Sequence, residues 1–216
     1  MLVFAMTAHE YAHAVTALHQ GDDTAYALGR VTLNPIPHID PVMSLLVPVM
    51  LWVVSGGTFT FGAAKPVPVN SRKFRNFRRG DVIVSSAGVI TNFLLALVFS
   101  LLFVGLGLVA RATPDAGPVV ETAQRMMRYG ILINLVLCFF NLIPVPPLDG
   151  SHLLYHLLPP RAGTWYRGLS RFGYLFVFAL FFFRPLLNLV YVPVAVVMGM
   201  LQRIIAPYDV MTMGPL

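Results

Sequence analysis

Two histidines and a glutamate near the N-terminus have the spacing of a catalytic metal-binding motif. The stretch His9-Glu10-Tyr11-Ala12-His13 places its imidazoles four residues apart, which puts them on one face of a helix. Such a pair can bind one Zn²⁺, and the intervening glutamate can take a proton from an attacking water. The alternative is a pair of hydrogen-bonded core histidines, or coincidence. Because a carboxylate and two imidazoles are costly to bury in an apolar helix, we favour a zinc site.

Two histidines do not complete a catalytic zinc site, which takes three protein ligands and keeps one position for water. Asp149 is the acidic residue embedded in a long apolar stretch, the segment 141–150 with sequence NLIPVPPLDG. Its prolines break a helix at membrane depth, and broken helices are tolerated there only where they face protein or a cavity. We therefore predict that Asp149 is the third ligand. The alternative is that Asp149 only caps the helix that begins at Gly150, and it can serve as both.

The composition indicates a polytopic membrane protein. Of the 216 residues, 57% are hydrophobic and only 11% are charged, against about 45–50% and about 25% in an average soluble domain. An ordinary soluble globule with so little charge would expose large apolar patches, and a disordered chain would be polar. A disulfide scaffold is excluded because Cys138 is the only cysteine.

Apolar segments must position these residues, and a bilayer span needs about 20 residues. The N-terminal apolar segment carries the two histidines, and it is not a signal peptide because it lacks a basic start and polar residues interrupt it. A short run contains Pro48 and is expected to re-enter the membrane or lie at its interface. The segments are residues 1–18, the short run 42–55, and the longer stretches 82–110, 129–158 and 172–205.

We predict an all-α membrane protein with a single domain over residues 1–216. It is a polytopic bundle of four to five transmembrane segments, with short β or re-entrant elements on the cytosolic side. A short strand is expected at Thr58–Phe61, where β-forming residues alternate.

The net charge of +6 indicates orientation in a membrane. Basic residues concentrate in the loop 65–79, and short loops rich in lysine and arginine stay in the cytoplasm. We expect no nucleic-acid partner, because Phe74 and Phe77 among these basic residues are only a weak match to the interleaved aromatic residues of a nucleic-acid-binding surface. The basic residues of this loop are Lys65, Arg72, Lys73, Arg75, Arg78 and Arg79.

The two motifs together resemble the site-2 protease family of intramembrane zinc metalloproteases. The His9-Glu10-x-x-His13 motif is followed, two spans later, by the Asn-x-x-Pro-x-x-x-x-Asp-Gly segment 141–150. The segment 86–92, SAGVITN, is similar to the family's Gly-x-x-x-Asn element. The resemblance covers nearly the whole chain. Residues 29–35 and 61–70 look like the minimal bacterial and archaeal subgroup, which lacks PDZ and CBS domains.

The resemblance implies a role for each matching residue. His9, His13 and Asp149 would hold one Zn²⁺. Glu10 would act as the general base for the attacking water and then donate a proton to the leaving amine.

Two asparagines at matching positions would contact the substrate backbone or the oxyanion. They are Asn92 and Asn141. A side-chain amide in apolar surroundings needs a partner, and an unwound substrate segment offers unpaired backbone groups. The alternative for each is an interhelical hydrogen bond.

The resemblance also places the zinc nearer the cytosol, which constrains the topology. If the loop 65–79 is cytosolic, the segment 82–110 leaves the cytosol and the next segment returns Asp149 to it. Residues 1–18 must then run from outside to inside, and residues 42–55 must enter and return on one side.

Only eight residues precede His9, which is short for a full span. Either the first helix is short or the protein begins upstream of Met1.

The predicted function is hydrolysis of a peptide bond in or near a transmembrane helix of a membrane-protein substrate, in regulated intramembrane proteolysis. Residues 58–69 could pair with the locally unwound substrate as an added strand. The expected location is a prokaryotic cell (inner) membrane. One alternative is a catalytically silent membrane scaffold or regulator of the same fold, although the costly Glu10 carboxylate argues against it. A second alternative is a metal transporter, which would more often distribute its ligands along a path.

Overall fold

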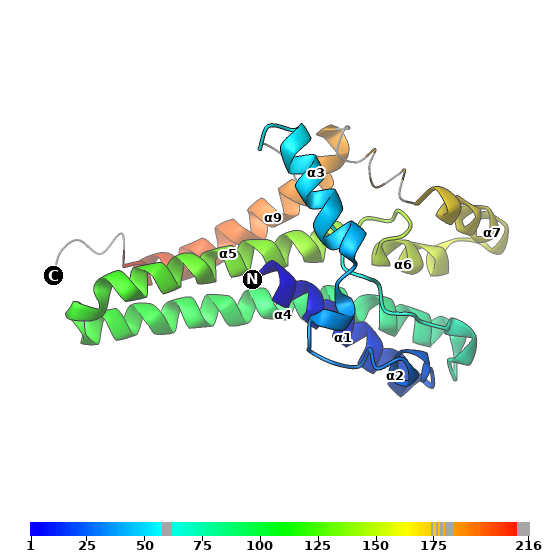
Figure 1. Ribbon diagram of the computed structural model, residues 1–216, viewed down its shortest axis with the longest axis horizontal. Coiled ribbons are helices and arrows are strands. Elements are labelled where there is room, and N and C mark those ends of the chain that lie inside the picture. The colour runs from blue at the N-terminus through cyan, green and yellow to red at the C-terminus, as the bar shows by residue number, and fades with distance from the viewer. Residues whose placement is uncertain (58–61, 174, 176, 178, 180–183, 211–216) are drawn as a thin grey trace. The chain divides into compact units, whose positions relative to one another are not determined.

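The computed structural model describes residues 1–57, 62–173, 175, 177, 179 and 184–210 (Figure 1). The described residues form helices joined by irregular segments, and no strand occurs among them. The predicted all-α fold class is confirmed. The strand expected at Thr58–Phe61 lies outside the described residues.

The chain divides into two compact units. One unit comprises Met6–Gly88 and is called the N-terminal unit here. The other comprises Met1–Ala5 together with Val89–Leu216 and is called the C-terminal unit. The single domain predicted over residues 1–216 stays a prediction.

Helix α1 spans Leu2–Gln20 and confirms the helix expected for the first apolar segment. It ends at Gln20 because Gly21 adopts a φ of 108°, a conformation that glycine takes without strain. The amide of Gly21 donates to the Leu18 carbonyl at 3.1 Å, and the amide of Asp22 donates to the Ala17 carbonyl at 2.9 Å. These bonds close the last turn, so the helix end is fixed by local chemistry.

The short apolar run forms a helix from Pro41 to Val54. Its first part, Pro41–Leu46, is a π-helix, and α3 continues over Val47–Val54. Asp40 caps the start, since its Oδ1 accepts from the amides of Val42 at 2.8 Å and Met43 at 3.0 Å. These two backbone bonds hold the pKa of Asp40 below its usual value. Re-entry into the membrane stays a prediction for this helix.

The remaining elements of the N-terminal unit are short. An irregular extended segment over residues 62–70 leads into the basic loop 65–79 and overlaps its start. The others are α2 (Thr24–Ala27), the 3₁₀ turns η1 (Ile36–His38) and η3 (Ser71–Lys73), and the first turns of α4 (Phe77–Ala112).

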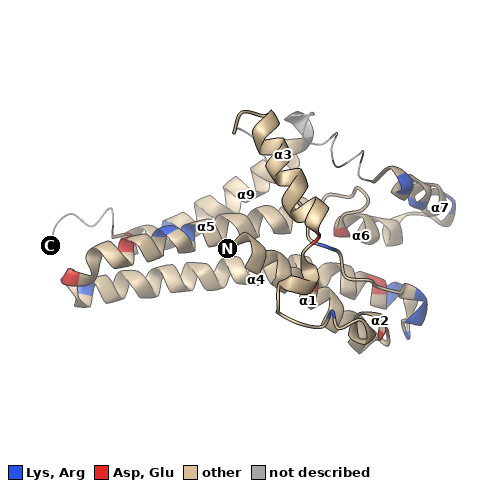
Figure 2. Cartoon of the chain, viewed as in Figure 1, with Lys and Arg blue, Asp and Glu red and all other residues tan. Residues whose placement is uncertain are grey.

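Two helices among the described residues are long and apolar enough to cross a membrane, judged by length and composition. They are α4 and the segment Leu187–Tyr208. Along α4 the charged residues lie near its two ends, with none between Asp81 and Arg111 (Figure 2). This pattern is typical of a spanning helix. The predicted number of four to five spans stays a prediction.

In the C-terminal unit, α4 turns through η4 (Pro114–Ala116) into α5 (Gly117–Asn141). The two helices lie side by side in Figure 1, and α9 (Arg184–Ile205) packs on α5. A Cβ atom at Gly130 of α5 would lie 2.8 Å from the Phe99 ring of α4. Glycine therefore permits the close approach of these helices.

The apolar stretch 129–158 is interrupted, as its prolines predict, and contains the end of α5 and the whole of α6. Helix α5 ends at Asn141, and α6 begins at Asp149 and continues to Leu157. The proline-rich sequence between them prevents a continuous helix, as expected. The chain continues through α7 (Pro160–Gly168) and η5 (Leu169–Phe172).

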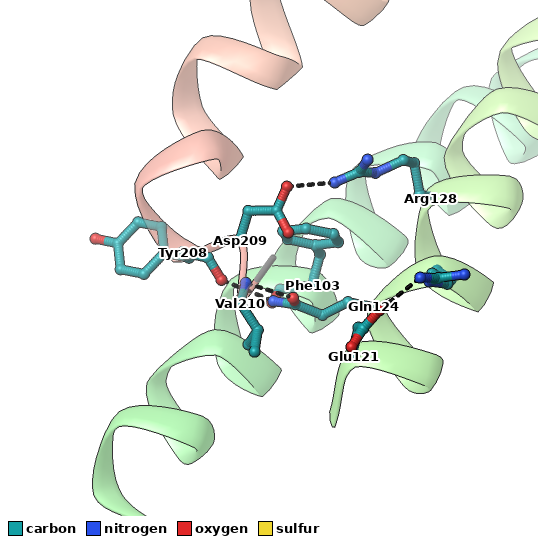
Figure 3. Close-up of polar contacts among 8 residues, drawn as sticks. Phe103, Glu121, Gln124, Arg128, Tyr208, Asp209 and Val210 are labelled. Atoms are coloured by element: carbon teal, nitrogen blue, oxygen red, sulfur yellow. Dashed lines mark hydrogen bonds and ion pairs between the residues drawn. The ribbon is translucent and has the colours of Figure 1, made fainter. Parts of the chain in front are cut away.

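The buried side-chain amide of Gln124 on α5 binds the segment that follows α9. Its side chain is 1% exposed, and its Nε2 donates to the carbonyl of Tyr208 at 2.7 Å and to that of Phe103 at 3.1 Å (Figure 3). Its Oε1 accepts from the amide of Val210 at 3.0 Å. Beside it, Arg128 and Asp209 form an ion pair at 2.6 Å. One side chain thus satisfies backbone groups of both α4 and the segment after α9.

We expect Gln124→Met to destabilise the protein, because Met fills the space and supplies no polar group. Each backbone group left without a partner costs about 1–3 kcal/mol. Denaturant titration in detergent, monitored by circular dichroism, measures the loss. Arg125→Gln is the matched control, since the Arg125–Glu121 pair is exposed and such pairs contribute about 0–1 kcal/mol. Equal stabilities of the two variants would contradict the expectation.

Candidate metal centre

The two histidines of the predicted motif come together on one face of α1. Both are buried, each 8% exposed. The Nε2 atoms of His9 and His13 lie 3.0 Å apart, and their rings meet edge to face. The two histidines therefore lie on one face of α1, as their spacing predicted, and their role as metal ligands stays a prediction.

A backbone carbonyl of α4 fixes the orientation of His13. Its Nδ1 lies 2.8 Å from the carbonyl oxygen of Val84, so Nδ1 carries the hydrogen and donates it. The other nitrogen, Nε2, then carries the lone pair and can coordinate a metal. Metal-binding histidines usually have such a partner on the second nitrogen. Val84 itself is buried in a cluster with Ala17 and Phe74, which holds the accepting carbonyl in place.

The absence of a side chain at Gly88 makes room for both imidazoles. A Cβ atom there would lie 2.4 Å from Cε1 of His9 and 2.6 Å from Nε2 of His13. Real Cβ atoms do not approach so closely, so no other residue fits without moving the histidines. The sequence placed Gly88 in the Gly-x-x-x-Asn element without giving it a role. Its contact with the histidines was missed because it depends on how α1 packs on α4.

The histidine pair fits a zinc ion. An ion about 2.0–2.1 Å from each of two nitrogens holds them about 3.3 Å apart in tetrahedral geometry. The observed separation of 3.0 Å is close to that value. Imidazole nitrogen is also a preferred zinc donor.

Glu10 follows His9 on α1, and its carboxylate is half-buried. Its Oε2 accepts a hydrogen bond from the backbone amide of Val67 at 2.7 Å. Val67 belongs to the extended segment 62–70 of the same unit. The glutamate between the histidines is therefore held by a specific donor.

Asp149 is the first residue of α6 and is half-buried. The adjacent Gly150 allows α6 to start close to the preceding chain, because a Cβ atom there would lie 2.2 Å from the Leu142 carbonyl oxygen. The sequence left open that Asp149 only caps a helix beginning at Gly150, and this is wrong: α6 begins at Asp149 itself, and Leu148 occupies the cap position without a side-chain hydrogen bond. The ligand role of Asp149 stays a prediction.

The two asparagines predicted to bind substrate are both hydrogen-bonded within the protein. Asn92 is fully buried, and its Nδ2 donates to Oδ1 of Asn134 on α5 at 2.9 Å. This is the interhelical bond that the sequence left open as an alternative. The Nδ2 of Asn141 donates to the Leu137 carbonyl of its own helix at 2.9 Å. Substrate binding by Asn92 and Asn141 stays a prediction, and sequence reasoning missed Asn134 as a partner.

We expect Gly88→Ala to lower zinc binding while the protein remains folded, since the added methyl group occupies the space of the two imidazoles. Zinc per chain, measured by inductively coupled plasma mass spectrometry after dialysis, checks this. Gly105→Ala in the same helix is the control, because nothing lies within 4 Å of a Cβ atom there. Full zinc occupancy in Gly88→Ala at low zinc concentration would show that the close approach is unimportant.

The sequence model for peptidase family M50 matches residues 41–182. The Bacillus subtilis (strain 168) protein named "Putative zinc metalloprotease YwhC" is 38% identical over 188 residues, which cover 86% of this chain and 79% of that protein. No solved structure matches the chain.

Mycobacterial relatives match over a similar part of the chain. "Putative zinc metalloprotease Rip2" of Mycolicibacterium smegmatis is 32% identical over 180 residues, and its Mycobacterium tuberculosis H37Rv counterpart is 31% identical. Each alignment covers 83% of this chain and 64% of the relative, so the chain spans just under two thirds of the Rip2 proteins.

These matches confirm the predictions of a metalloprotease and of Zn²⁺ as its cofactor. The chain therefore belongs to peptidase family M50, the site-2 protease family.

Proposed function

We propose that this metalloprotease hydrolyses a peptide bond in or near a transmembrane helix of a membrane-protein substrate, in regulated intramembrane proteolysis. The observation that carries the proposal is the buried His9–His13 pair with Glu10 between them on an apolar helix. A substrate helix hides its backbone in internal hydrogen bonds, so it must unwind locally before cleavage.

His9, His13 and Asp149 are proposed to hold one Zn²⁺. The first two supply their Nε2 atoms, and His13 is oriented by the Val84 carbonyl. Asp149 supplies a carboxylate from the start of α6, after a proline-broken segment of the kind that lines cavities at membrane depth. When bound, the ion polarises the scissile carbonyl and lowers the pKa of the attacking water.

Glu10 performs the proton transfers in the proposed reaction. Its carboxylate takes a proton from the attacking water and returns it to the leaving amine. The Val67 amide on Oε2 leaves Oε1 as the atom that exchanges the proton.

The substrate backbone is proposed to contact Asn92 and Asn141. Asn141 is the last residue of α5, next to the broken segment that precedes Asp149. Asn92 would have to exchange its bond with Asn134 for one to the substrate. Such an exchange is possible because each amide has both donors and an acceptor.

The proposed location is a prokaryotic inner membrane, with the chain crossing several times as one domain. The basic loop 65–79 is cytosolic in this arrangement. Two observations support this placement of the loop. The part of α4 that follows the loop is long and free of charged residues (Figure 2), and basic loops prefer the cytosol.

Two substitutions separate proton transfer from metal binding. Glu10→Gln is expected to keep about one zinc per chain and to reduce cleavage by at least about 100-fold, because the amide cannot accept the proton. Asp149→Ala is expected to lose zinc and cleavage together, because a ligand is removed. Zinc is measured by mass spectrometry, and cleavage is measured on a reporter whose single transmembrane segment the wild type cuts.

Asp115→Ala is the matched control for Asp149→Ala, since Asp115 is exposed in the η4 turn far along the chain from the motifs. Full cleavage by Glu10→Gln would refute its proton-transfer role. Zinc retention in Asp149→Ala would refute the three-ligand set. Folded wild type that contains no zinc would favour the scaffold alternative.

The placement of the helix Pro41–Val54 is tested by labelling from each side of the membrane. Single cysteines are introduced at Asp40 and Ser55 in a Cys138→Ser background. Ser55 is preferred to Gly57, where a φ of 82° disfavours any side chain. We expect a membrane-impermeant maleimide to reach both positions from the same side, because the helix is too short for a regular span. Labelling from opposite sides would contradict re-entry.

A further inference from the structure

A single backbone amide between two prolines holds the Glu10 carboxylate. The amide belongs to Val67, and its neighbours Pro66 and Pro68 have no N–H group. Residues 66–68 therefore contain one backbone donor, and the structure directs it to Oε2 of Glu10 at 2.7 Å. We refer to the extended segment 62–70 that carries this donor as the Pro-Val-Pro strap.

The sequence of the strap makes its centre stiff. Each proline fixes its own φ, and each residue before a proline is confined to extended conformations. Lys65 and Val67 both precede a proline. The donor is thus carried by a segment with few alternative backbone conformations, which reduces the entropy lost in holding it at Glu10.

Arg30 anchors the strap on the side of the chain that precedes Val67. The Arg30 side chain is buried, and its Nη2 donates to the Lys65 carbonyl at 2.7 Å and lies 3.4 Å from the Pro66 carbonyl. The Lys65 amide in turn donates to the His38 carbonyl at 2.8 Å. The peptide groups immediately before the Val67 amide are therefore fixed.

The buried side chain of His38 contacts the guanidinium group of Arg30. It is 2% exposed, and its Nε2 lies 2.9 Å from the Thr32 carbonyl, so Nε2 carries the hydrogen. The Nδ1 atom then carries a lone pair, and it faces Nη2 of Arg30 at 3.5 Å. A buried imidazole and a buried guanidinium thus act together on the strap.

The side chain of Val67 and the end of the strap are also fixed. Val67 is buried in a cluster with Ala14 and Ala25, which prevents the residue from rotating its amide away from Glu10. Beyond it, the Asn70 amide donates to Oδ2 of the buried Asp22 at 2.6 Å. The strap is therefore held before, at and after the residue that supplies the donor.

We propose that Val67 and Arg30 are positioning residues for the proton transfers of Glu10. The proposal rests on the proposed function, in which Glu10 is the general base. A fixed donor on one oxygen restricts the rotation of a carboxylate, so its second oxygen is presented in a preferred orientation. Neither residue is itself a catalytic residue, because both act through Glu10. Loss of such orientation costs about 10- to 100-fold in rate.

The sharpest test replaces the Val67 amide by an ester. Nonsense suppression with 2-hydroxyisovaleric acid at position 67 keeps the valine side chain and converts the N–H group into an oxygen. We expect kcat on the cleaved reporter to fall about 10- to 100-fold, with KM and zinc per chain unchanged. The same hydroxy acid at the exposed Val69 is the matched control, because the amide that donates to Glu10 is that of Val67 and not that of Val69. This control is expected to keep the wild-type kcat.

Arg30 is tested by a pair of substitutions. Arg30→Met is expected to lower kcat in the same way as the ester, whereas Arg30→Lys is expected to keep part of the wild-type kcat, because an ammonium group can still donate to the Lys65 carbonyl.

A fall in zinc occupancy together with kcat in the ester variant would show that the strap supports the metal site and would overturn the proposal. Unchanged kcat in the ester variant would overturn it as well.

Hydrogen exchange provides a readout that does not need activity. Because the two prolines carry no amide hydrogen, mass spectrometry with fragmentation across 66–68 reports on Val67 alone. Its exchange is expected to be slower in the wild type than in Glu10→Ala, and equal rates would contradict the contact.

The two proposals fail in different ways. If Glu10→Gln is fully active, the proposed function fails. If Glu10→Gln is inactive and the ester variant keeps wild-type kcat, only the positioning role fails.

Discussion

The arrangement of the two imidazoles depends on one close approach, between the face of α1 that carries them and Gly88 of α4. Protein interiors are packed so densely that one added methylene is felt by its neighbours. At Gly88 the neighbours are atoms of the two imidazole rings, including Nε2 of His13. The bond from His13 to the Val84 carbonyl acts from one turn earlier on α4 and fixes the tautomer. The packing of α1 on α4 and the orientation of the two imidazoles therefore depend on the same few positions.

Much of this could be predicted from local pattern. The spacing of His9 and His13 gave their common face, because helical periodicity is a property of the backbone. The prolines after Asn141 predicted a break, and α5 ends there. The end of α1 at Gly21 follows from a single residue and its allowed φ angles. These features share one physical cause, which is that neighbouring residues determine them.

What could not be predicted depends on contacts between distant residues. Asn92 pairs with Asn134, and Glu10 with the Val67 amide, although 42 and 57 positions separate the partners. Sequence shows that a buried amide or carboxylate needs a partner, and many residues satisfy that need equally well. The choice is made by tertiary packing. Gly88 could be recognised as part of a motif, but its contact with the histidines could not be deduced, because that contact also depends on tertiary packing.

The length of α4 has a consequence for the surrounding bilayer. Its charge-free part, residues 82–110, is about 44 Å long at the rise of an α-helix, whereas a hydrocarbon core is about 30 Å thick. A hydrophobic mismatch of this size is relieved when the helix tilts, when the bilayer thickens locally, or when part of the apolar helix surface lies outside the hydrocarbon core of the bilayer. Because α4 also carries Val84 and Gly88 near its start, a change in the tilt of α4 moves the backbone groups that contact the two histidines.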